Sequence, residues 1–350
     1  MICGLRTLPR STLLSSRLNS SFQCRAMSSS LLPPRYILTP HELHTALSQQ
    51  KRDTSPRIIP VHAAWFMPND PAHRTGASSF NSLRIPGARF FDLDVIKHPD
   101  SPYPHMLPTP AVFADAMQTL GISPNDTVVC YDSEEVGLFS APRAAWTFRQ
   151  MAHPGSVHVL DNFKVWTEAA LPIASGPETA DAESSEYEIA PKSVTKYDAP
   201  AASSVAQQYV DYEHVRLWAK RQVDGPREDV EPTLIDARPA GRFDGSAPEP
   251  RPGLPSGHVP GSVSVPFTSV LDPTTKTILP KERLVEVFKK AGVSKDNPAI
   301  SACGTGVTAA IIDLALMRAG WTDDERKLYD GSWTEWAQRA TEAEGLIVKS

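Results

Sequence analysis

The sequence predicts an α/β protein that contains two copies of one domain, each a parallel sheet flanked by helices. Short apolar strand segments alternate with amphipathic helical segments along the chain, and this alternation is typical of a parallel sheet with helices on both faces. The same succession of segments occurs twice, and each time it follows a Pro-Gly pair, Pro86-Gly87 and Pro260-Gly261. The 350 residues of the chain are also enough for about two domains.

The first copy continues from its Pro-Gly pair through a helix and two strands. Residues 111–120 have the apolar spacing of an amphipathic helix, and Gly121 supplies its stop. The apolar run at 127–131 predicts a buried strand. Residues 157–161 predict a further strand that ends in a turn, and Trp166 comes soon after it.

The second copy has matching segments in the same order. Residues 282–291 predict an amphipathic helix that Gly292 ends. The segments 299–302 and 327–331 predict a buried strand and a strand that leads into a turn, and Trp333 follows. The second copy therefore has the same expected elements as the first.

These repeats divide the chain into four segments. We expect a first domain at 35–175 and a second domain at 207–345. Residues 176–206 between them are rich in Ala, Ser, Pro and Glu without a sustained period, which is typical of a linker. Residues 1–30 precede both domains and differ from them in composition.

Residues 1–30 have the composition of an organelle transit peptide. Arginines are spread among Ser, Leu and Thr, and no acidic residue precedes Glu42. A secretory signal would need a continuous apolar stretch, which this segment lacks. We therefore expect a mitochondrial protein, and a start at Met27 would give a cytoplasmic form. The alternative is a disordered tail that carries no address.

Composition excludes several classes of function. The net charge of −5 gives no indication of nucleic-acid binding, and no apolar run approaches the 18 or more residues of a membrane span. The four cysteines are too far apart for a CxxC metal site and suggest no disulfide framework. We therefore expect no nucleic acid, no membrane insertion and no metal, and a reducing compartment.

The segment 303–308, Cys-Gly-Thr-Gly-Val-Thr, places a thiol between the strand at 299–302 and an apolar helix at 309–316. Backbone amides converge in such a Gly-rich turn, and the helix dipole also favours an anion there. A thiol in that place should ionise more readily than a free cysteine, whose pKa is about 8.5. We therefore expect Cys303 to be a nucleophile. A structural cysteine that merely precedes a helix is the alternative.

The first copy has Asp132 at the place that Cys303 occupies in the second. Cys130 lies two residues earlier, inside the apolar strand, where a small hydrophobic residue is expected. The duplication therefore indicates a division of labour, in which only the second copy keeps the nucleophile.

Three motifs of the chain resemble those of the tandem-domain rhodanese sulfurtransferases, and the resemblance covers nearly the whole chain after residue 35. They are the Cys303 loop, Gly-His-Val-Pro-Gly at 257–261 and Tyr-Asp-Gly-Ser-Trp-Thr-Glu-Trp at 329–336. The resemblance implies two rhodanese-like domains, the first an inactive copy. The loop is similar to that of members that use 3-mercaptopyruvate. Members that prefer thiosulfate carry cationic residues where this chain has Gly304 and Thr305.

The resemblance also implies a chemistry in two half-reactions. The Cys303 thiolate attacks the sulfur of a small donor, 3-mercaptopyruvate or less well thiosulfate, and becomes a persulfide as pyruvate leaves. A thiol acceptor such as thioredoxin, or cyanide in an assay, then takes the outer sulfur. The resemblance implies no cofactor and a monomeric enzyme.

The family pattern assigns further residues to the reaction. Asp94 and His105 of the first domain would join the hydroxyl of Thr305 in a relay like that of serine proteases, which can move a proton. Most members have serine at the place of Thr305, and threonine adds a methyl group and a stiffer χ1. Trp65 and Arg143 match positions near the domain interface.

The donor-binding residues are also implied by matching context. Arg242 and Arg251 would bind the carboxylate and the keto oxygen, because a guanidinium offers paired planar donors. Two arginines in a polar loop could otherwise be ordinary surface residues. The loop residues assigned to donor binding are Gly304, Gly306, Val307 and Thr308.

Three other functions use a related fold or the same loop. A phosphatase of related fold would need a Cys-x5-Arg loop, but this chain has Ala309 at the arginine position. A non-catalytic docking module would not need the intact Cys303 loop. Sulfur relay to a protein acceptor, for tRNA or cofactor thiolation, would use the same persulfide and is compatible with the sequence.

Overall fold

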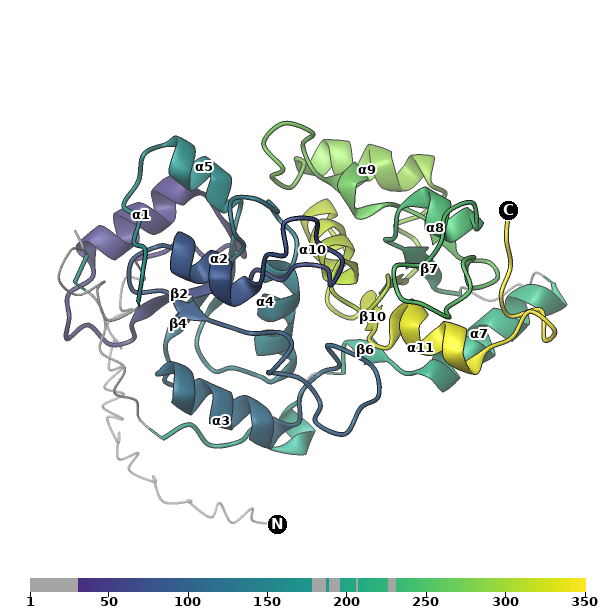
Figure 1. Ribbon diagram of the computed structural model, residues 1–350, viewed down its shortest axis with the longest axis horizontal. Helices are drawn as coiled ribbons and strands as arrows, with labels where there is room; N and C mark the ends of the chain where they lie inside the picture. Colours follow the sequence, from purple (N-terminus) through teal and green to yellow (C-terminus); the bar gives the residue numbers. More distant parts are fainter. Residues whose placement is uncertain (1–30, 178–186, 189–195, 206, 226–230) are drawn as a thin grey trace, which may run out of the picture. The chain divides into compact units, whose positions relative to one another are not determined.

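The chain forms two parallel sheets, and the strands of both sheets follow the same relative order (Figure 1). The computed structural model describes residues 31–177, 187–188, 196–205, 207–225 and 231–350. The first sheet has the order β1-β5-β4-β2-β3, and the second has β6-β10-β9-β7-β8. Every pair of neighbouring strands is parallel. The shared order confirms the predicted fold of two equivalent α/β sheets.

The central strands of each sheet are short and almost fully buried, as their apolar sequences predict. The first sheet consists of β1 (Ile37–Leu38), β2 (Ile58–His62), β3 (Arg89–Phe90), β4 (Thr127–Tyr131) and β5 (Val157–Leu160). The second sheet consists of β6 (Tyr209–Val210), β7 (Thr233–Asp236), β8 (Val263–Ser264), β9 (Ala299–Ala302) and β10 (Arg326–Tyr329).

Helices cover both faces of the first sheet. One face packs against α1 (Pro40–Gln49), α2 (Gly76–Ser82) and α5 (Phe163–Glu168), and the other packs against α3 (Pro110–Leu120) and α4 (Ala141–Gln150). Thr109 caps α3 by accepting a hydrogen bond from the Val112 amide, and Gly121 ends the helix with φ of 70°. That left-handed conformation is one that glycine adopts without strain.

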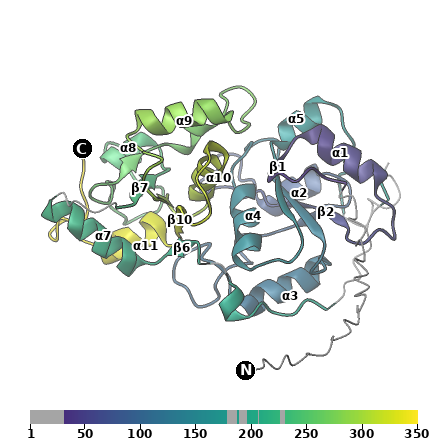
Figure 2. The same ribbon diagram turned by 180° about the vertical axis from the view of Figure 1, so that it is seen from behind.

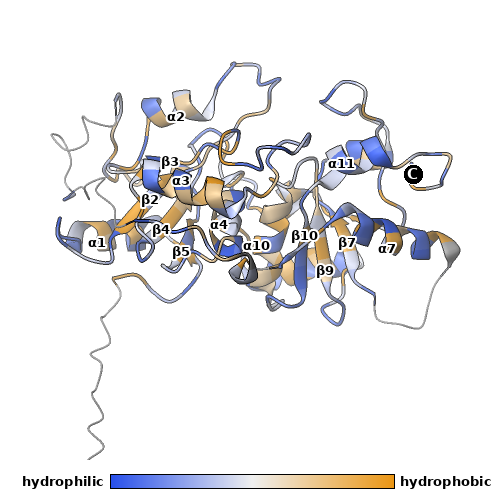
Figure 3. Cartoon of the chain, turned by 90° about the horizontal axis from the view of Figure 1, so that it is seen from below, coloured by the Kyte–Doolittle hydropathy of each residue, from blue (hydrophilic) through white to orange (hydrophobic). Residues whose placement is uncertain are grey.

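The second sheet is covered in the same way. Its outer face packs against α7 (Tyr212–Asp224) and α11 (Ser332–Arg339), and its other face packs against α9 (Lys281–Lys290) and α10 (Ala309–Ala319). A short helix, α8 (Ala240–Asp244), follows β7, and two 3₁₀ turns occur at Ala202–Ser204 and Phe267–Val270. Figure 3 shows that the central strands β2, β4 and β9 are mostly hydrophobic, whereas α7 mixes hydrophilic and hydrophobic residues.

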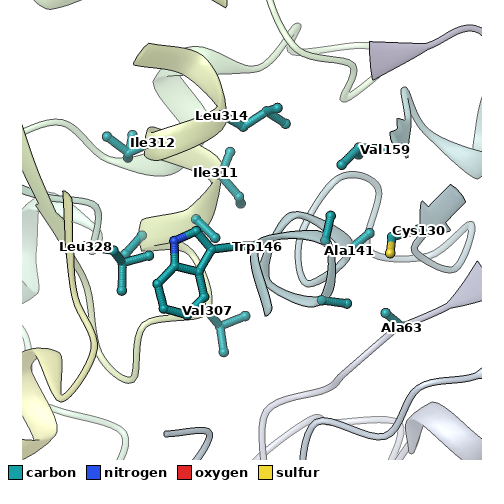
Figure 4. Close-up of a cluster of buried hydrophobic side chains, with 14 of the residues drawn as sticks. Ala63, Cys130, Ala141, Trp146, Val159, Val307, Ile311, Ile312, Leu314 and Leu328 are labelled. Atoms are coloured by element: carbon teal, nitrogen blue, oxygen red, sulfur yellow. The ribbon is translucent and has the colours of Figure 1, made fainter. Parts of the chain in front are cut away.

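The two sheets share one hydrophobic core through α4 and α10, which pack against each other (Figures 1 and 2). Trp146 of α4 lies beside Ile311 of α10 and Leu328 of β10 in this core (Figure 4). The same core extends to Cys130 in β4, which is fully buried. Residues 31–350 form a single compact unit, so side chains from both sheets can contribute to one site.

Most of the expected elements match the structure within two residues at their ends, and the helix expected at 309–316 is α10, which continues to Ala319. The predicted helices at 111–120 and 282–291 are α3 and α9, and the predicted strands are β4, β5, β9 and β10. The expected presequence lies outside the described residues, as does much of the expected linker. Two described residues of that linker contact the first half of the chain: the hydroxyls of Tyr187 and Tyr197 lie 2.8 Å from ring nitrogens of His44 and His153.

Candidate active site

Cys303 lies directly after the central strand β9, at the edge of the second sheet where the carboxyl ends of parallel strands meet. Its side chain faces a cavity, although the residue is only 2% exposed. The Cys303 amide donates to Ser332 Oγ at 3.1 Å, and its carbonyl accepts from the Trp333 amide at 2.9 Å. The start of α11 therefore holds the cysteine in place. Ligands of open α/β sheets bind at this edge.

The loop after Cys303 turns its backbone into an anion site. Within the described ranges, the amides of residues 304–308 have no hydrogen-bond acceptor, and they precede the N-terminus of α10. Gly306 has φ of 76°, and a Cβ there would lie 2.7 Å from Arg143 Nη1 and 3.0 Å from the Asp330 carbonyl oxygen. Only glycine fits such a place. Free amides at a helix start attract an anion.

The structure brings Asp94, His105 and Thr305 together, as the family pattern implies. His105 Nδ1 lies 3.1 Å from Thr305 Oγ1, and His105 Nε2 lies 2.9 Å from Asp94 Oδ1. Burial lowers the pKa of His105, and the adjacent Asp94 carboxylate opposes that shift. The imidazole is therefore neutral at neutral pH, which allows it to accept a proton.

Trp65 completes this arrangement from the first half of the chain. Its Nε1–H donates to Asp94 Oδ2 at 3.0 Å, and its ring meets the His105 ring edge to face at 4.7 Å. Asp94 itself lies at the surface, where its side chain is 60% exposed. Since one carboxylate oxygen faces Trp65 and the other faces His105, Trp65 fixes the direction in which Asp94 points.

A buried ion pair between the two halves holds the loop that carries His105. Arg143 of α4 lies 2.6 Å from Asp330 Oδ1 at the end of β10, and both side chains are at most 4% exposed. Arg143 Nη2 donates to the His105 carbonyl at 2.5 Å, and Asp330 Oδ2 accepts from the Leu107 amide at 2.8 Å. His105 has φ of 63°, a conformation that is costly for a side chain larger than glycine. The contacts of Arg143 and Asp330 with this loop stabilise that backbone conformation of His105.

Cys303 opens into a cavity of about 320 Å³ whose walls differ in character. One wall is aromatic: Trp65 stacks near Phe139, and Phe139 meets Phe267 edge to face at 5.5 Å. The other wall carries Arg242 and Arg251. The loop residues that line the cavity are Gly304, Thr305, Val307 and Thr308. Gly306 does not line it and instead faces Arg143.

The two cavity arginines have different surroundings. Arg242 of α8 binds Glu249 with Nε at 3.0 Å and Nη2 at 2.6 Å. In the described part of the chain, no carboxylate pairs with the Arg251 guanidinium. Burial lowers the pKa of Arg251, and the charge of Arg242 acts in the same direction. Arg251 is therefore the cation with its hydrogen-bond donors open to an anionic ligand.

Sequence reasoning missed the groups that support these residues. Glu249 and the Arg143–Asp330 pair were not assigned a role, and Trp65 was only placed near the interface. The partners of Trp65 and Arg143 are far away in sequence. Glu249 lies only 7 residues from Arg242 and 11 from Arg238, but this spacing does not by itself indicate that they pair. Within the described ranges, no group of three His, Cys, Asp or Glu side chains could hold a metal ion, and no helix is long and apolar enough to cross a bilayer.

A buried thiol beside free amides, a neutral histidine and two cations suits an enzyme that uses a cysteine nucleophile on a small anion. Comparison with known proteins identifies the class. Residues 218–339 match the rhodanese-like domain family. Thiosulfate sulfurtransferase TUM1 of Saccharomyces cerevisiae is 38% identical over 291 residues, which cover 81% of this chain and 90% of the yeast protein. Its crystal structure aligns with a TM-score of 0.74 at 35% identity, over 91% of this chain and 99% of the other.

Two further proteins extend the comparison. Thiosulfate/3-mercaptopyruvate sulfurtransferase 1, mitochondrial, of Arabidopsis thaliana is 39% identical over 290 residues, 81% of this chain and 72% of the plant protein. The crystal structure of SseA from Escherichia coli, a 3-mercaptopyruvate sulfotransferase with the rhodanese fold, aligns with a TM-score of 0.66 at 30% identity, over 85% of this chain and 98% of that chain. The chain therefore belongs to the tandem-domain rhodanese family and is a sulfurtransferase.

Proposed function

We propose that this enzyme takes the sulfane sulfur of 3-mercaptopyruvate onto Cys303 and passes it to a thiol acceptor. The observation that carries the proposal is the position of Cys303, which faces a cavity with free loop amides on one side and Arg251 on the other. The amides suit a thiolate or a persulfide anion. The guanidinium suits the carboxylate of an α-keto acid.

The first half-reaction balances without an outside reactant. The Cys303 thiolate bonds to the donor sulfur, the bond between sulfur and the methylene carbon breaks, and its electron pair stays on carbon as the pyruvate enolate. The thiol proton of the donor then moves to that carbon and gives pyruvate. His105 and the Thr305 hydroxyl, 3.1 Å apart, are placed to carry this proton.

The second half-reaction returns the thiolate. An acceptor thiolate attacks the outer sulfur of the persulfide, and the sulfur–sulfur bond to Cys303 breaks. Thioredoxin and small thiols are the acceptors that we propose. The yeast relative is named for thiosulfate and the plant relative for both donors, which supports thiosulfate as a second donor, and we propose that it is the poorer one. The preference of the enzyme for 3-mercaptopyruvate over thiosulfate is set in part by the neutral Gly304 and Thr305 beside Cys303.

We also propose that the enzyme acts as a monomer in mitochondria. The Arg-rich composition of residues 1–30 supports this location, as does the mitochondrial name of the plant relative. A form that begins at Met27 would lack that segment and remain cytoplasmic.

One experiment tests the proposal directly. The purified enzyme is incubated with 3-mercaptopyruvate alone, and intact mass and released pyruvate are measured, followed by steady-state turnover of both donors with a thiol acceptor. We expect one added sulfur atom per chain. Cys303→Ser should lose the adduct and turnover, whereas Cys130→Ala, a change at the buried cysteine of β4, should keep both. A Cys303→Ser enzyme that still turns over would refute the mechanism, and an unmodified wild type would favour a docking module.

A further inference from the structure

Glu249 lies behind the donor cavity and joins two arginines. Its Oε1 accepts from Arg238 Nη1 at 2.8 Å and from Arg242 Nε at 3.0 Å, and its Oε2 accepts from Arg242 Nη2 at 2.6 Å. The Glu249 side chain is only 3% exposed. Both carboxylate oxygens are thus engaged by cations that also line the cavity, and none of these bonds reaches the nucleophile.

The charges around this carboxylate nearly balance. Arg238 is buried and also binds Asp236, with Nε 3.0 Å from both carboxylate oxygens, while its guanidinium lies 4.2 Å from the centre of the Trp333 ring. Three guanidinium groups, those of Arg238, Arg242 and Arg251, face two carboxylates. One positive charge is therefore in excess, before the thiolate is counted. Where water is excluded from a cavity, the net charge of the cavity interacts strongly with a charged ligand.

We infer that Glu249 is a specificity-determining residue, which matches the charge of the cavity to a donor with one negative charge and against a donor with two. The inference rests on the proposed function and names the determinant of its donor class. 3-Mercaptopyruvate carries one carboxylate, whereas thiosulfate is a dianion. With Glu249 present, Arg242 is already paired, and among the described residues that line the cavity Arg251 is the arginine without a carboxylate partner.

The sign of the effect follows from Coulomb's law. Removal of the Glu249 charge makes the cavity more positive by one unit. A dianion gains about twice the attraction that a monoanion gains from that change. The ratio of kcat/KM for thiosulfate to kcat/KM for 3-mercaptopyruvate should therefore rise. A purely structural role would instead lower both values together.

The test compares donor ratios among variants. Glu249→Gln keeps the shape but removes the charge, and we expect the thiosulfate to 3-mercaptopyruvate ratio to rise on the order of 10-fold or more. Glu249→Asp keeps the charge with a shorter chain, so the ratio should stay near that of the wild type even if both values fall. Glu231→Gln is the matched control. Glu231 also pairs with an arginine, Arg221, at a distance of 3.5 Å, but neither residue lines the cavity. Its ratio should not change.

Glu249→Met provides a second neutral variant of similar length in case Glu249→Gln does not fold, and the ratio should shift in the same direction. An unchanged ratio in a folded neutral variant that still forms the persulfide would overturn the inference, as would an equal shift in Glu249→Asp. A wild-type enzyme that turns over neither donor would instead refute the proposed function.

Discussion

The two halves of the chain contain the same strand-to-helix loop, but only one of them is open to a ligand. In the first half, the Asp132 carboxylate accepts hydrogen bonds from the amides of Phe139, Ser140 and Ala141 at 2.8 to 2.9 Å, and from the Ser140 hydroxyl at 2.6 Å. In the second half, Cys303 stands at the equivalent place after its central strand, and the loop amides have no acceptor in the described part of the chain. The loop of the first half binds the carboxylate of its own Asp132, whereas the loop of the second half has free amides for the anion of a ligand.

The filled loop still contributes to the open one. The Ser140 hydroxyl that donates to Asp132 also accepts from the Trp65 amide at 3.0 Å. Trp65 in turn directs Asp94 toward His105. A continuous series of hydrogen bonds therefore runs from the first loop to the relay at the second. The first loop, which has Asp132 in place of a cysteine, therefore supports the residues around the second loop.

The largest expected effect comes from filling the open loop in the same way as the first. Cys303→Asp places a carboxylate where the thiol stands, and we expect kcat to fall on the order of 1000-fold or more, because no nucleophile remains. Circular dichroism should show a folded protein, since the carboxylate can accept from the loop amides. Steady-state turnover and intact mass after incubation with donor are the measurements. A variant that keeps more than a small fraction of turnover would contradict the comparison.

The relay across the halves should lose its function as a unit. His105→Ala and Thr305→Ala should each slow single-turnover pyruvate release by about 100- to 10,000-fold. The double variant should be little slower than either single one, because members of one relay are not additive. His41→Ala, a change at an exposed position of α1, is the control. Losses that simply multiply would show that the two residues act independently.

The open loop should depend on nearby cations to hold its ligand. We expect Arg251→Ala to lower kcat/KM for 3-mercaptopyruvate by about 10- to 150-fold, the effect of losing a hydrogen bond to a charged group. Arg242→Ala should lower kcat/KM less, because two of the Arg242 guanidinium nitrogens already donate to Glu249. Arg251→Lys and Arg242→Lys should not restore kcat/KM fully, because lysine lacks the planar paired donors of arginine. Arg283→Ala on the exposed face of α9 should have no effect, and normal values in both cavity variants would refute the assignment.

The filled loop should be a stabilising element. Asp132→Asn replaces one carboxylate oxygen with an amide group that cannot accept from the loop N–H groups. We expect a loss of about 1–3 kcal/mol in the free energy of unfolding, measured by urea unfolding, and a smaller effect on turnover than any change at Cys303. Burial raises the pKa of Asp132, although its hydrogen-bond donors oppose the shift. An unchanged unfolding midpoint would mean that the carboxylate is not needed in this loop.

The smallest expected effect is a shift in pH dependence. Burial lowers the pKa of His105 and the Asp94 carboxylate raises it again in part. Activity needs the neutral imidazole, so kcat/KM should fall as pH drops through this pKa. Asp94→Asn removes the charge that favours the imidazolium, and the acidic limb of the profile should move to lower pH, with a lower plateau. A limb that moves to higher pH, or stays in place, would exclude His105 as the titrating group.

Much of the fold could be predicted because its signals are local. The helices α3 and α9 have clear apolar periods and glycines at their ends, and the central strands are short apolar runs. The short edge strands, such as β1 and β6, and the helices α2 and α8 have no such signal. Two residues of strand have no period, and their pairing depends on a neighbour elsewhere in the chain.

Local patterns were enough to predict the duplication and the place of Cys303 after a central strand, and the family motifs pointed to residues that line its cavity. How these residues are supported became visible only in the folded chain. Arg143 pairs with Asp330 across the two halves, because folding brings together side chains that are far apart in sequence. Glu249 lies only seven residues from Arg242, but their burial beside the cavity exists only in the folded chain. A candidate nucleophile such as Cys303 can be predicted from its own turn and helix, because these are local. The charge balance and the orientation of a site depend on long-range contacts that exist only in the folded chain.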